Sequence, residues 1–187
     1  MFNTAGPCVE GMHYIIDPLA RIDSGEVLAL IDQQRYFVLH APRQTGKTTS
    51  LLALMKLLNS GDCYRSLYVN VEAAQTARGD VERGMRTITG AFQDAERDFL
   101  GSRTLGSLVE EAWATHGANG ALGGMLSAWA RSCSRPVVLI LDEVDALVGD
   151  TLVSLLRQLR AGYPQRPLAF PQSVILCGVR DVRDYRI

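Results

Sequence analysis

The 187-residue sequence has no long apolar stretch, since its longest uninterrupted aliphatic run covers only residues 137–141. A helix that crosses a bilayer needs about 20 such residues. The sequence also has no excess of positive charge, because 19 lysines and arginines face 20 aspartates and glutamates and leave a net charge of -1. A dedicated nucleic-acid-binding domain would carry a clear basic excess. The composition therefore indicates neither a membrane segment nor a nucleic acid partner.

Cysteine is scarce, and no two cysteines form a CxxC pair; the four residues are Cys8, Cys63, Cys133 and Cys177. This spacing argues against a disulfide framework or a zinc site, and favours reduced thiols in the core of an intracellular protein. The N-terminus has no basic segment leading into an apolar one, and Asp17 falls where a secretory signal would be apolar. We therefore expect a cytoplasmic location.

What the sequence does contain is ordinary for one soluble globular domain, with 47% hydrophobic and 21% charged residues. Four short apolar runs predict strands at residues 36–40, 66–71, 137–141 and 173–179. Apolar residues at steps of three and four predict helices at residues 48–58, 81–99, 105–113, 122–130 and 151–161, the last with a cap at Asp150. This alternation indicates an α/β fold with a doubly wound parallel sheet, which binds ligands at the carboxyl ends of its strands.

The stretch Ala-Pro-Arg-Gln-Thr-Gly-Lys-Thr at residues 41–48 lies between the first predicted strand and the first predicted helix, the context that a Walker A phosphate loop requires. In such a loop, backbone N–H groups and the helix N-terminus surround the phosphates, the lysine reaches the β- and γ-phosphates, and the next hydroxyl ligates Mg²⁺. Lys47 is one of only two lysines beside 17 arginines. Ala41 replaces the usual first glycine, so we expect it at φ < 0. The predicted ATP-binding residues are Arg43, Gln44, Thr45, Gly46, Lys47, Thr48 and Thr49, with Thr48 also a magnesium ligand.

Residues 137–143 combine an apolar strand with two acids at its carboxyl end, which is typical of a Walker B strand. Asp142 is predicted to hold Mg²⁺ through water, and Glu143 is predicted to orient and polarise the attacking water. On its own the acidic pair could also be a turn that caps a helix. The phosphate loop 95 residues upstream favours the catalytic interpretation. We predict that Asp145 is a helix cap or a surface acid.

With these two motifs the chain resembles the AAA-like ATPases of bacteria, in the branch of P-loop ATPases that has an additional strand and a catalytic glutamate. The resemblance runs from about residue 13 to the last residue. It implies a three-layer sandwich with sheet order 5-1-4-3-2, of which this chain supplies order 1-4-3-2. It further implies a fragment without the fifth strand and the helical lid, which leaves strand 36–40 as an open apolar edge. Residues 1–35 are expected to form an N-terminal segment with a lead-in helix, and residues 36–187 a P-loop ATPase core with a helical insert at 73–135.

The resemblance also implies roles for residues outside the two motifs. Related ATPases carry a polar residue that senses the γ-phosphate at the end of the fourth strand, but residues 177–179 include no Asn, Ser or Thr. Arg180 is the nearest polar candidate for that catalytic role, with a surface arginine as the alternative. Tyr14, Ile15 and Pro18 resemble the segment that lines the adenine pocket, although packing of an edge strand on the core explains them as well.

Two further groups gain roles from the resemblance. Asn70 and Glu72 follow the second strand, where related ATPases place a residue that holds the catalytic glutamate inactive. Arginines on or just after the helix that follows the Walker B strand could act as a finger on the nucleotide of a neighbouring copy, or could form a solvated face. These arginines are Arg157, Arg160 and Arg166.

The favoured function is an ATP-binding and ATP-hydrolysing domain that converts nucleotide state into a conformational signal for another module. The implied ligands are ATP, ADP and Mg²⁺, and an oligomer of identical chains or an unidentified protein partner is compatible with the resemblance. The alternative is a nucleotide-dependent switch with negligible turnover. A P-loop kinase is less favoured, because Glu143 directly after Asp142 suits water activation better than transfer to an acceptor. No Asn-Lys-x-Asp sequence supports guanine recognition.

Overall fold

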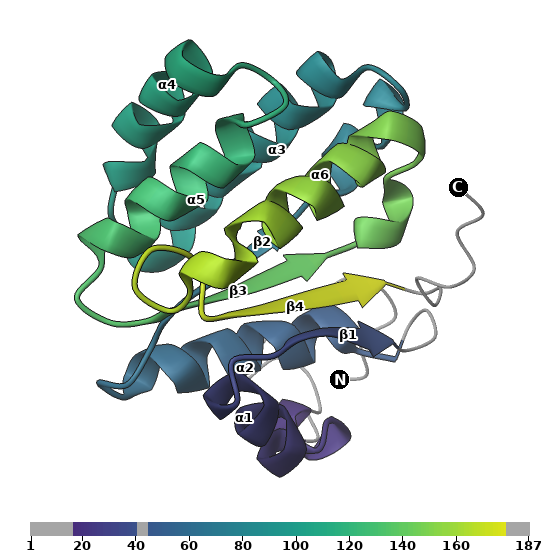
Figure 1. The fold of residues 1–187 in the computed structure, drawn as a ribbon. Helices are drawn as coiled ribbons and strands as arrows, with labels where there is room; N and C mark the ends of the chain where they lie inside the picture. The colour runs from purple at the N-terminus through teal and green to yellow at the C-terminus, as the bar shows by residue number, and fades with distance from the viewer. Residues whose placement is uncertain (1–16, 41–44, 179–187) are drawn as a thin grey trace.

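The computed structural model describes residues 17–40 and 45–178, and four parallel strands form the centre of this part of the chain. The strands are β1 (Tyr36–His40), β2 (Arg65–Asn70), β3 (Val137–Asp142) and β4 (Ser173–Gly178). Their order across the sheet is β1-β4-β3-β2 (Figure 1). The order 1-4-3-2 and the α/β class that the sequence predicts are therefore confirmed.

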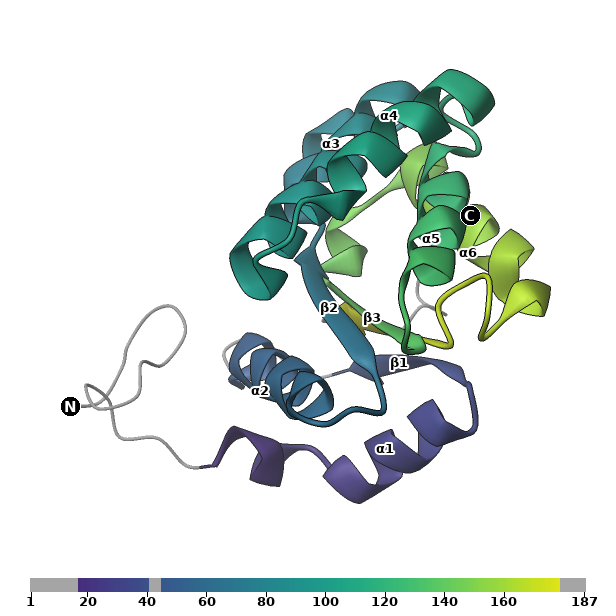
Figure 2. The ribbon, with the colours of Figure 1, turned by 90° about the vertical axis from the view of Figure 1, so that its left-hand side faces the viewer.

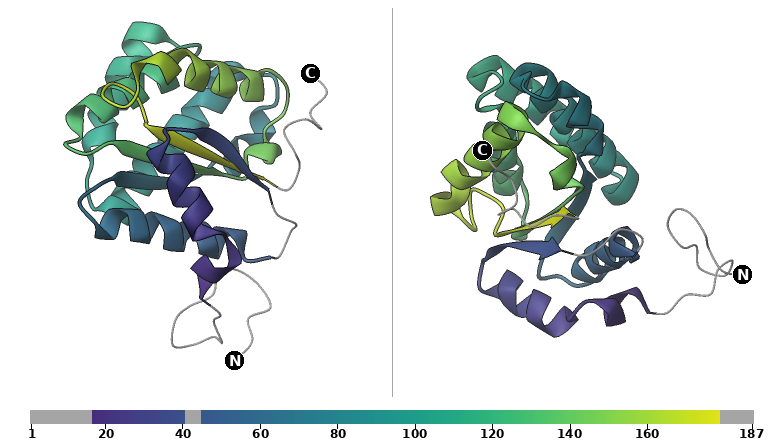
Figure 3. Two further views of the ribbon diagram at one scale, coloured as in Figure 1. Left: turned by 60° about the horizontal axis from the view of Figure 1, so that its bottom comes forward. Right: turned by 90° about the vertical axis from the view of Figure 1, so that its right-hand side faces the viewer.

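Helices cover both faces of the sheet (Figure 2). On one face lie α1 (Ser24–Asp32) and α2 (Lys47–Ser60), and on the other lie α3 (Val81–Ala95), α4 (Thr104–His116), α5 (Ala121–Ser132) and α6 (Gly149–Gly162). Figure 3 shows the same separation from two further directions. Short helical turns connect these elements: η1 (Pro18–Arg21), η2 (Glu72–Ala77), η3 (Glu96–Leu100), η4 (Val144–Ala146) and η5 (Tyr163–Gln165). Within residues 17–40 and 45–178, no helix has the length and apolarity needed to cross a membrane.

Every residue of β3 is buried, which accounts for the uninterrupted apolar run in the sequence. Val138 and Ile140 pack on the side of α1 and α2, whereas Leu139 and Leu141 pack with the helices of the other face. β3 also lies between β4 and β2, so both of its edges are paired. The strand therefore carries its last residue, Asp142, into a fully buried position.

The start of α6 differs from the sequence prediction. The cap predicted at Asp150 is wrong, because α6 already begins at Gly149 and Asp150 lies exposed in its first turn. Val148 precedes the helix and makes no side-chain cap. The N–H of Thr151 instead donates to the carbonyl of Arg78 at 3.3 Å. A backbone carbonyl from another segment thus satisfies one of the N–H groups that a helix start leaves without a partner.

The helix predicted over residues 81–99 is confirmed in its extent, but it changes type, because α3 ends at Ala95 and continues directly into the π-helical turn η3. The buried carboxylate of Glu96 accepts a hydrogen bond from the backbone N–H of Leu105 at 2.8 Å, which anchors this turn to the start of α4. The wider turn carries Phe99 away from the buried face of α3. Its side chain is 43% exposed and meets the ring of Tyr68 on β2.

Three of the four cysteines lie in the described residues, and their burial differs. Cys63 is exposed, Cys133 is half-buried and Cys177 is buried. The prediction of core cysteines is therefore wrong for Cys63, which lies in the loop between α2 and β2. Cys8 lies outside the described residues.

β1 forms one edge of the four-stranded sheet, and Val38 on this strand is 41% exposed. The strand is apolar along its centre, so the described sheet presents the apolar edge that the sequence predicts. The N-terminal segment around residues 14–16, which could fold over this edge, lies outside the described residues.

The insert packs on α6 through a glycine. A Cβ atom added to Gly84 of α3 would lie 2.5 Å from Cγ2 and 2.6 Å from Oγ1 of Thr151, closer than van der Waals contact allows. Thr151 is fully buried in the first turn of α6. The absence of a side chain at Gly84 therefore permits the close approach of these two helices.

We expect Gly84→Ala to lower the free energy of unfolding by about 1–2 kcal/mol, because overpacking outweighs the helix propensity that alanine gains. Gly90→Ala is the matched control on the same helix, since a Cβ atom there meets no atom within 4 Å. This control should stabilise the protein by about 0.5–1 kcal/mol. Urea unfolding followed by circular dichroism measures both values, and equal stability of the two variants would contradict the close approach.

Candidate functional site

The predicted phosphate loop leads from β1 into α2. Thr45 and Gly46 are described, Gly46 adopts the left-handed conformation (φ 80°, ψ 20°), and α2 begins at Lys47. The first N–H groups of a helix have no partner within it, so those of Lys47, Thr48 and Thr49 are available at this end of α2. Four of the predicted positions lie outside the described residues: Tyr14, Ala41, Arg43 and Gln44.

Lys47 is the buried cation of the site. Its side chain is only 9% exposed, and its Nζ has no hydrogen-bond partner among the residues that the structure describes. Glu143 is near enough for the charge of Lys47 to act on its carboxylate. A buried ammonium without a partner is costly. This arrangement at the start of a helix therefore fits an anion such as a phosphate group.

Thr48 and Asp142, the two predicted magnesium ligands, meet where α2 approaches the end of β3. Thr48 Oγ1 donates a hydrogen bond to Asp142 Oδ2 at 3.0 Å across 94 residues of sequence. Among the described residues, no group of three or more His, Cys, Asp or Glu could hold a metal ion. Mg²⁺ is usually bound by one or two carboxylates together with substrate phosphates and water. One carboxylate beside one hydroxyl therefore fits this ion.

Tyr68 is a site residue that the sequence analysis misses. It lies on β2, is 6% exposed, and its Oη donates a hydrogen bond to Asp142 Oδ2 at 2.8 Å. Burial, followed by the negative charge of Asp142, raises the pKa of Tyr68 well above its usual range, so the hydroxyl stays a donor. The sequence contains a signal for this contact with Asp142, because a buried tyrosine needs a hydrogen-bond partner and the predicted strand order places β2 beside β3.

Glu143, the predicted catalytic residue, follows β3 in the left-handed conformation (φ 57°, ψ 36°). Its N–H donates to Asp142 Oδ1 at 3.0 Å. Partial burial raises the pKa of Glu143, and the positive charge of Lys47 opposes this increase. Neighbouring acids raise the pKa further, namely Asp142, Asp145 and Glu72. The carboxylate is therefore a stronger base than an exposed glutamate.

The polar residues at and just after the end of β2 form a hydrogen bond with each other. Asn70 lies opposite Asp142 in the strand register, and its Oδ1 accepts a hydrogen bond from the N–H of Glu72 at 2.8 Å. Glu72 is exposed and acts on Glu143 through its charge. The restraint of Glu143 by Asn70 or Glu72 that the resemblance implies stays a prediction.

Asp145 is neither a helix cap nor a surface acid, so that prediction is wrong. Its side chain is half-buried with Oδ1 inaccessible, and a Cβ atom on Gly178 would lie 2.8 Å from this oxygen. The carboxylate thus occupies the space that a side chain at the end of β4 would need.

Cys177, the residue before Gly178 on β4, is buried, and burial raises its thiol pKa to about 12. Arg180, the predicted sensor, lies outside the described residues.

The three candidate arginine fingers lie in different surroundings. Arg157 and Arg160 are exposed on α6, and their roles stay predictions. Arg166 Nε donates to the carbonyl of Tyr163 at 2.7 Å, and its guanidinium lies 3.3 Å from the centre of the Tyr163 ring. Arg166 also donates to the carbonyl of Gln34 just before β1. These contacts within the chain favour a structural role for Arg166.

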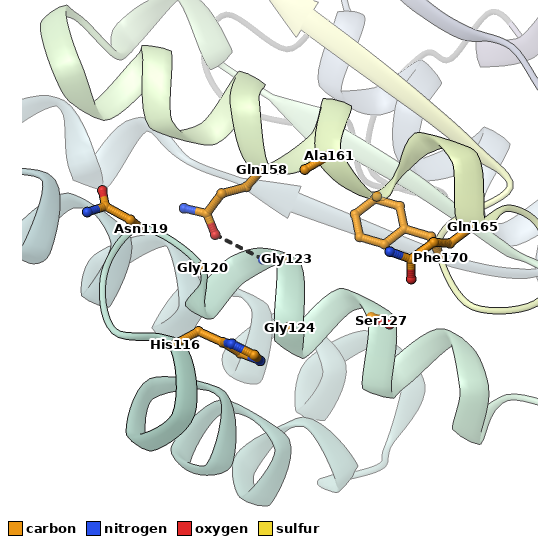
Figure 4. A pocket seen from close by; sticks show the side chains of 11 residues that line it. His116, Asn119, Gly120, Gly123, Gly124, Ser127, Gln158, Ala161, Gln165 and Phe170 are labelled. Atoms are coloured by element: carbon orange, nitrogen blue, oxygen red, sulfur yellow. Dashed lines mark hydrogen bonds between the residues drawn. The ribbon is translucent and has the colours of Figure 1, made fainter.

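A separate pocket of about 310 Å³ lies between α5, the α4–α5 loop and the end of α6 (Figure 4). Gln158 points from α6 toward α5, where its Oε1 accepts a hydrogen bond from the N–H of Gly123 at 3.0 Å. Its Nε2 donates to the carbonyl of Ala118 at 3.2 Å. The buried polar groups of Gln158 are thus used within the fold, and none of the described site residues lines this pocket.

The glycine-lysine-threonine turn after β1, the acidic end of β3 and the order β1-β4-β3-β2 together define a P-loop nucleotide-binding domain. A family model described as AAA domain matches residues 31–185. The match covers most of the chain, so the chain belongs to the AAA domain family and is an AAA-like P-loop ATPase domain. No curated protein sequence matches the chain closely enough to count as a relative.

The conformation of Glu143 leads to a stability prediction. A side chain with Cβ in the left-handed region costs about 1–2 kcal/mol, so Glu143→Gly should raise the free energy of unfolding of the nucleotide-free protein by about 1 kcal/mol. The raised pKa of Glu143 adds to this gain at neutral pH, because ionisation of the carboxyl group opposes folding. This electrostatic contribution is fully present above the folded-state pKa, and it disappears below the ordinary glutamate pKa of about 4.3.

Gln34→Gly is the matched control, since Gln34 also has a positive φ (58°) but lies outside the site. Its stability gain should arise from strain alone and should change little with pH. Urea unfolding at several pH values between about 4 and 7 measures both variants. A stability gain of Glu143→Gly that does not shrink relative to the control as the pH falls would contradict the electrostatic part, and a loss of stability would contradict the strain.

Proposed function

We propose that the chain binds ATP together with Mg²⁺ and hydrolyses it, and that the change in nucleotide state alters the conformation of a module joined to or bound by this domain. The observation that carries the proposal is Lys47. Its buried Nζ, without a hydrogen-bond partner in the described residues, lies at the start of α2 and close to the acidic end of β3. Membership of the AAA domain family supports nucleotide binding as the class of function.

In this proposal, Lys47 and the N–H groups at the start of α2 bind the β- and γ-phosphates. Thr48 and Asp142 hold the magnesium ion, Asp142 through water. The bound ion would neutralise phosphate charge and stabilise the charge that develops in the transition state. Other residues keep the nucleotide-binding or sensing roles expected from the sequence, as parts of the proposal: Thr45, Gly46, Thr49, Arg43, Gln44, Tyr14 and Arg180.

Glu143 is proposed to orient the attacking water and to accept its proton. Two observations support this role. The left-handed turn separates the side chain of Glu143 from that of Asp142, whose oxygens are occupied by hydrogen bonds. The raised pKa of Glu143 also brings its basicity closer to that needed at neutral pH.

Lys47→Ala should abolish stabilisation by nucleotide, because it removes the proposed phosphate-binding charge. Wild type should be stabilised by about 2.7 kcal/mol when MgATP is present at 100 times its Kd. Lys56→Ala is the matched control, since it removes the only other lysine, which is exposed on the same helix. Thermal melts with and without MgATP provide the measurement. Identical nucleotide-induced shifts in wild type and Lys47→Ala would rule out the phosphate-loop assignment.

Glu143→Gln should keep the affinity for MgATP within a few-fold while lowering turnover by about 100-fold or more, since an amide fills the same space but does not accept the proton. Phosphate release measures turnover, and calorimetric titration with MgATP, MgADP and MgGTP measures binding and base preference. Glu110→Gln, an exposed acid on α4, is the matched control and should retain wild-type turnover.

The same measurements separate the competing functions. Wild-type turnover that survives in Glu143→Gln would refute the role of this residue. Tight MgATP binding with phosphate release no faster than background would favour the nucleotide-dependent switch. Phosphate release that depends on an added acceptor molecule would favour a kinase.

A further inference from the structure

Two hydroxyl groups converge on one oxygen of Asp142. Its Oδ2 accepts hydrogen bonds from Tyr68 Oη at 2.8 Å and from Thr48 Oγ1 at 3.0 Å. The other oxygen, Oδ1, accepts the N–H of Glu143 at 3.0 Å. Because Asp142 is fully buried, these three donors from three separate segments, beside the thiol of Cys177 on β4, orient its carboxylate.

The two hydroxyl donors differ in position and in what they can do. Thr48 lies in the first turn of α2, and after donating its proton its oxygen still has lone pairs for a cation. Tyr68 lies opposite Ile140 in the strand register, two residues before the pair Asn70 and Asp142. Its long side chain therefore reaches Asp142 along the neighbouring strand. The pairing of β2 with β3 determines the direction in which the Tyr68 side chain extends.

We propose that Tyr68 is a positioning residue of the magnesium site: its hydroxyl holds the carboxylate of Asp142 in the orientation in which Asp142, through water, and Thr48 would hold the ion. This inference rests on the proposed MgATP function. Hydrogen bonds from such outer residues orient metal ligands, and their loss typically lowers metal affinity by about 10–100-fold. Tyr68 acts through Asp142 and is therefore not a catalytic residue.

Phe99 extends this arrangement into the helical insert. The rings of Tyr68 and Phe99 meet edge to face, with centres 5.9 Å apart and an interplanar angle of 86°. Phe99 belongs to the π-helical turn η3, which Glu96 anchors through hydrogen bonds from Ser102 Oγ at 2.7 Å and Leu105 N–H at 2.8 Å. An edge-to-face contact favours one ring placement. Phe99 thus holds the ring of Tyr68 while the hydroxyl holds Asp142.

The test compares Tyr68→Phe with wild type in the full chain. ATP binding is measured in EDTA and then at increasing Mg²⁺, and Mn²⁺ binding is measured by electron paramagnetic resonance with a non-hydrolysable ATP analogue. Tyr68→Phe keeps the ring and removes only the hydroxyl. We expect its ATP affinity in EDTA to stay within about two-fold of wild type. The Mg²⁺ and Mn²⁺ midpoints should rise by about 10-fold or more.

Tyr64→Phe is the matched control, because Tyr64 also donates its hydroxyl to a carboxylate, that of Asp32, away from the site. Its metal midpoints should equal those of wild type. Unchanged midpoints in Tyr68→Phe, or an equal shift in Tyr64→Phe, would overturn the inference. Absence of Mg²⁺-dependent ATP binding in wild type would instead overturn the proposed function, and with it this inference.

Phe99→Leu keeps the test decisive if Tyr68→Phe does not fold. Phe99 is partly exposed, so this substitution removes the edge-to-face contact at little cost to the core. We expect a rise of the Mg²⁺ midpoint in the same direction as for Tyr68→Phe and smaller, with ATP affinity in EDTA unchanged. A midpoint equal to that of wild type would overturn the inference that the placement of Tyr68 controls metal binding at Asp142.

Discussion

The site depends on a carboxylate that is taken completely out of water. Asp142 is fully buried at the end of β3, and burying a charge is costly unless hydrogen bonds replace the lost water. Its donors come from the start of α2, from β2 and from the turn that follows β3. The covered sheet creates the burial, and the burial requires these three segments to meet. The geometry of the candidate site therefore follows from the need to supply hydrogen bonds to one buried carboxylate, that of Asp142.

Several energetically unfavourable features lie close to Asp142, and the rest of the fold holds them in place. Glu143 has a positive φ, and burial and nearby acids raise its pKa. Lys47 is buried without a hydrogen-bond partner among the described residues. Strain and buried charge of this kind persist only where the surrounding structure enforces them, and they concentrate at functional sites. The large apolar clusters on both faces of the sheet supply that enforcement.

Much of this arrangement could be predicted from the sequence because it follows from local patterns. Apolar runs without alternation indicated a buried parallel sheet, and the resemblance supplied the strand order that the structure confirms. The spacing of glycine, lysine and threonine placed Lys47 and Thr48 at the start of α2, where they lie. The acidic pair placed Asp142 at the end of β3. The contact between Thr48 and Asp142 then follows from the sheet topology.

The remaining features depend on distances that no local pattern encodes. Periodicity gave no sign of the π-helical turn, because a wider turn leaves the spacing of apolar residues in the sequence unchanged. The sequence predicts Asp145 as a helix cap or a surface acid, and only the three-dimensional structure shows its carboxylate in the space beside Gly178. Tyr68 was the exception, since a polar hydroxyl in a buried strand next to Asp142 was a usable signal.

The helical insert contacts two elements that lead to the proposed site. The insert meets α6 at Gly84 and Thr151, and it meets β2 at Phe99 and Tyr68. β2 contributes a hydrogen-bond donor to Asp142, and α6 begins seven residues after this aspartate. A displacement of the insert would therefore affect Asp142 in two ways. One is through Tyr68 on the neighbouring strand β2, and the other is through the turn that leads from β3 to α6. In the proposed function, these contacts are the route by which the insert and the site around Asp142 would be coupled.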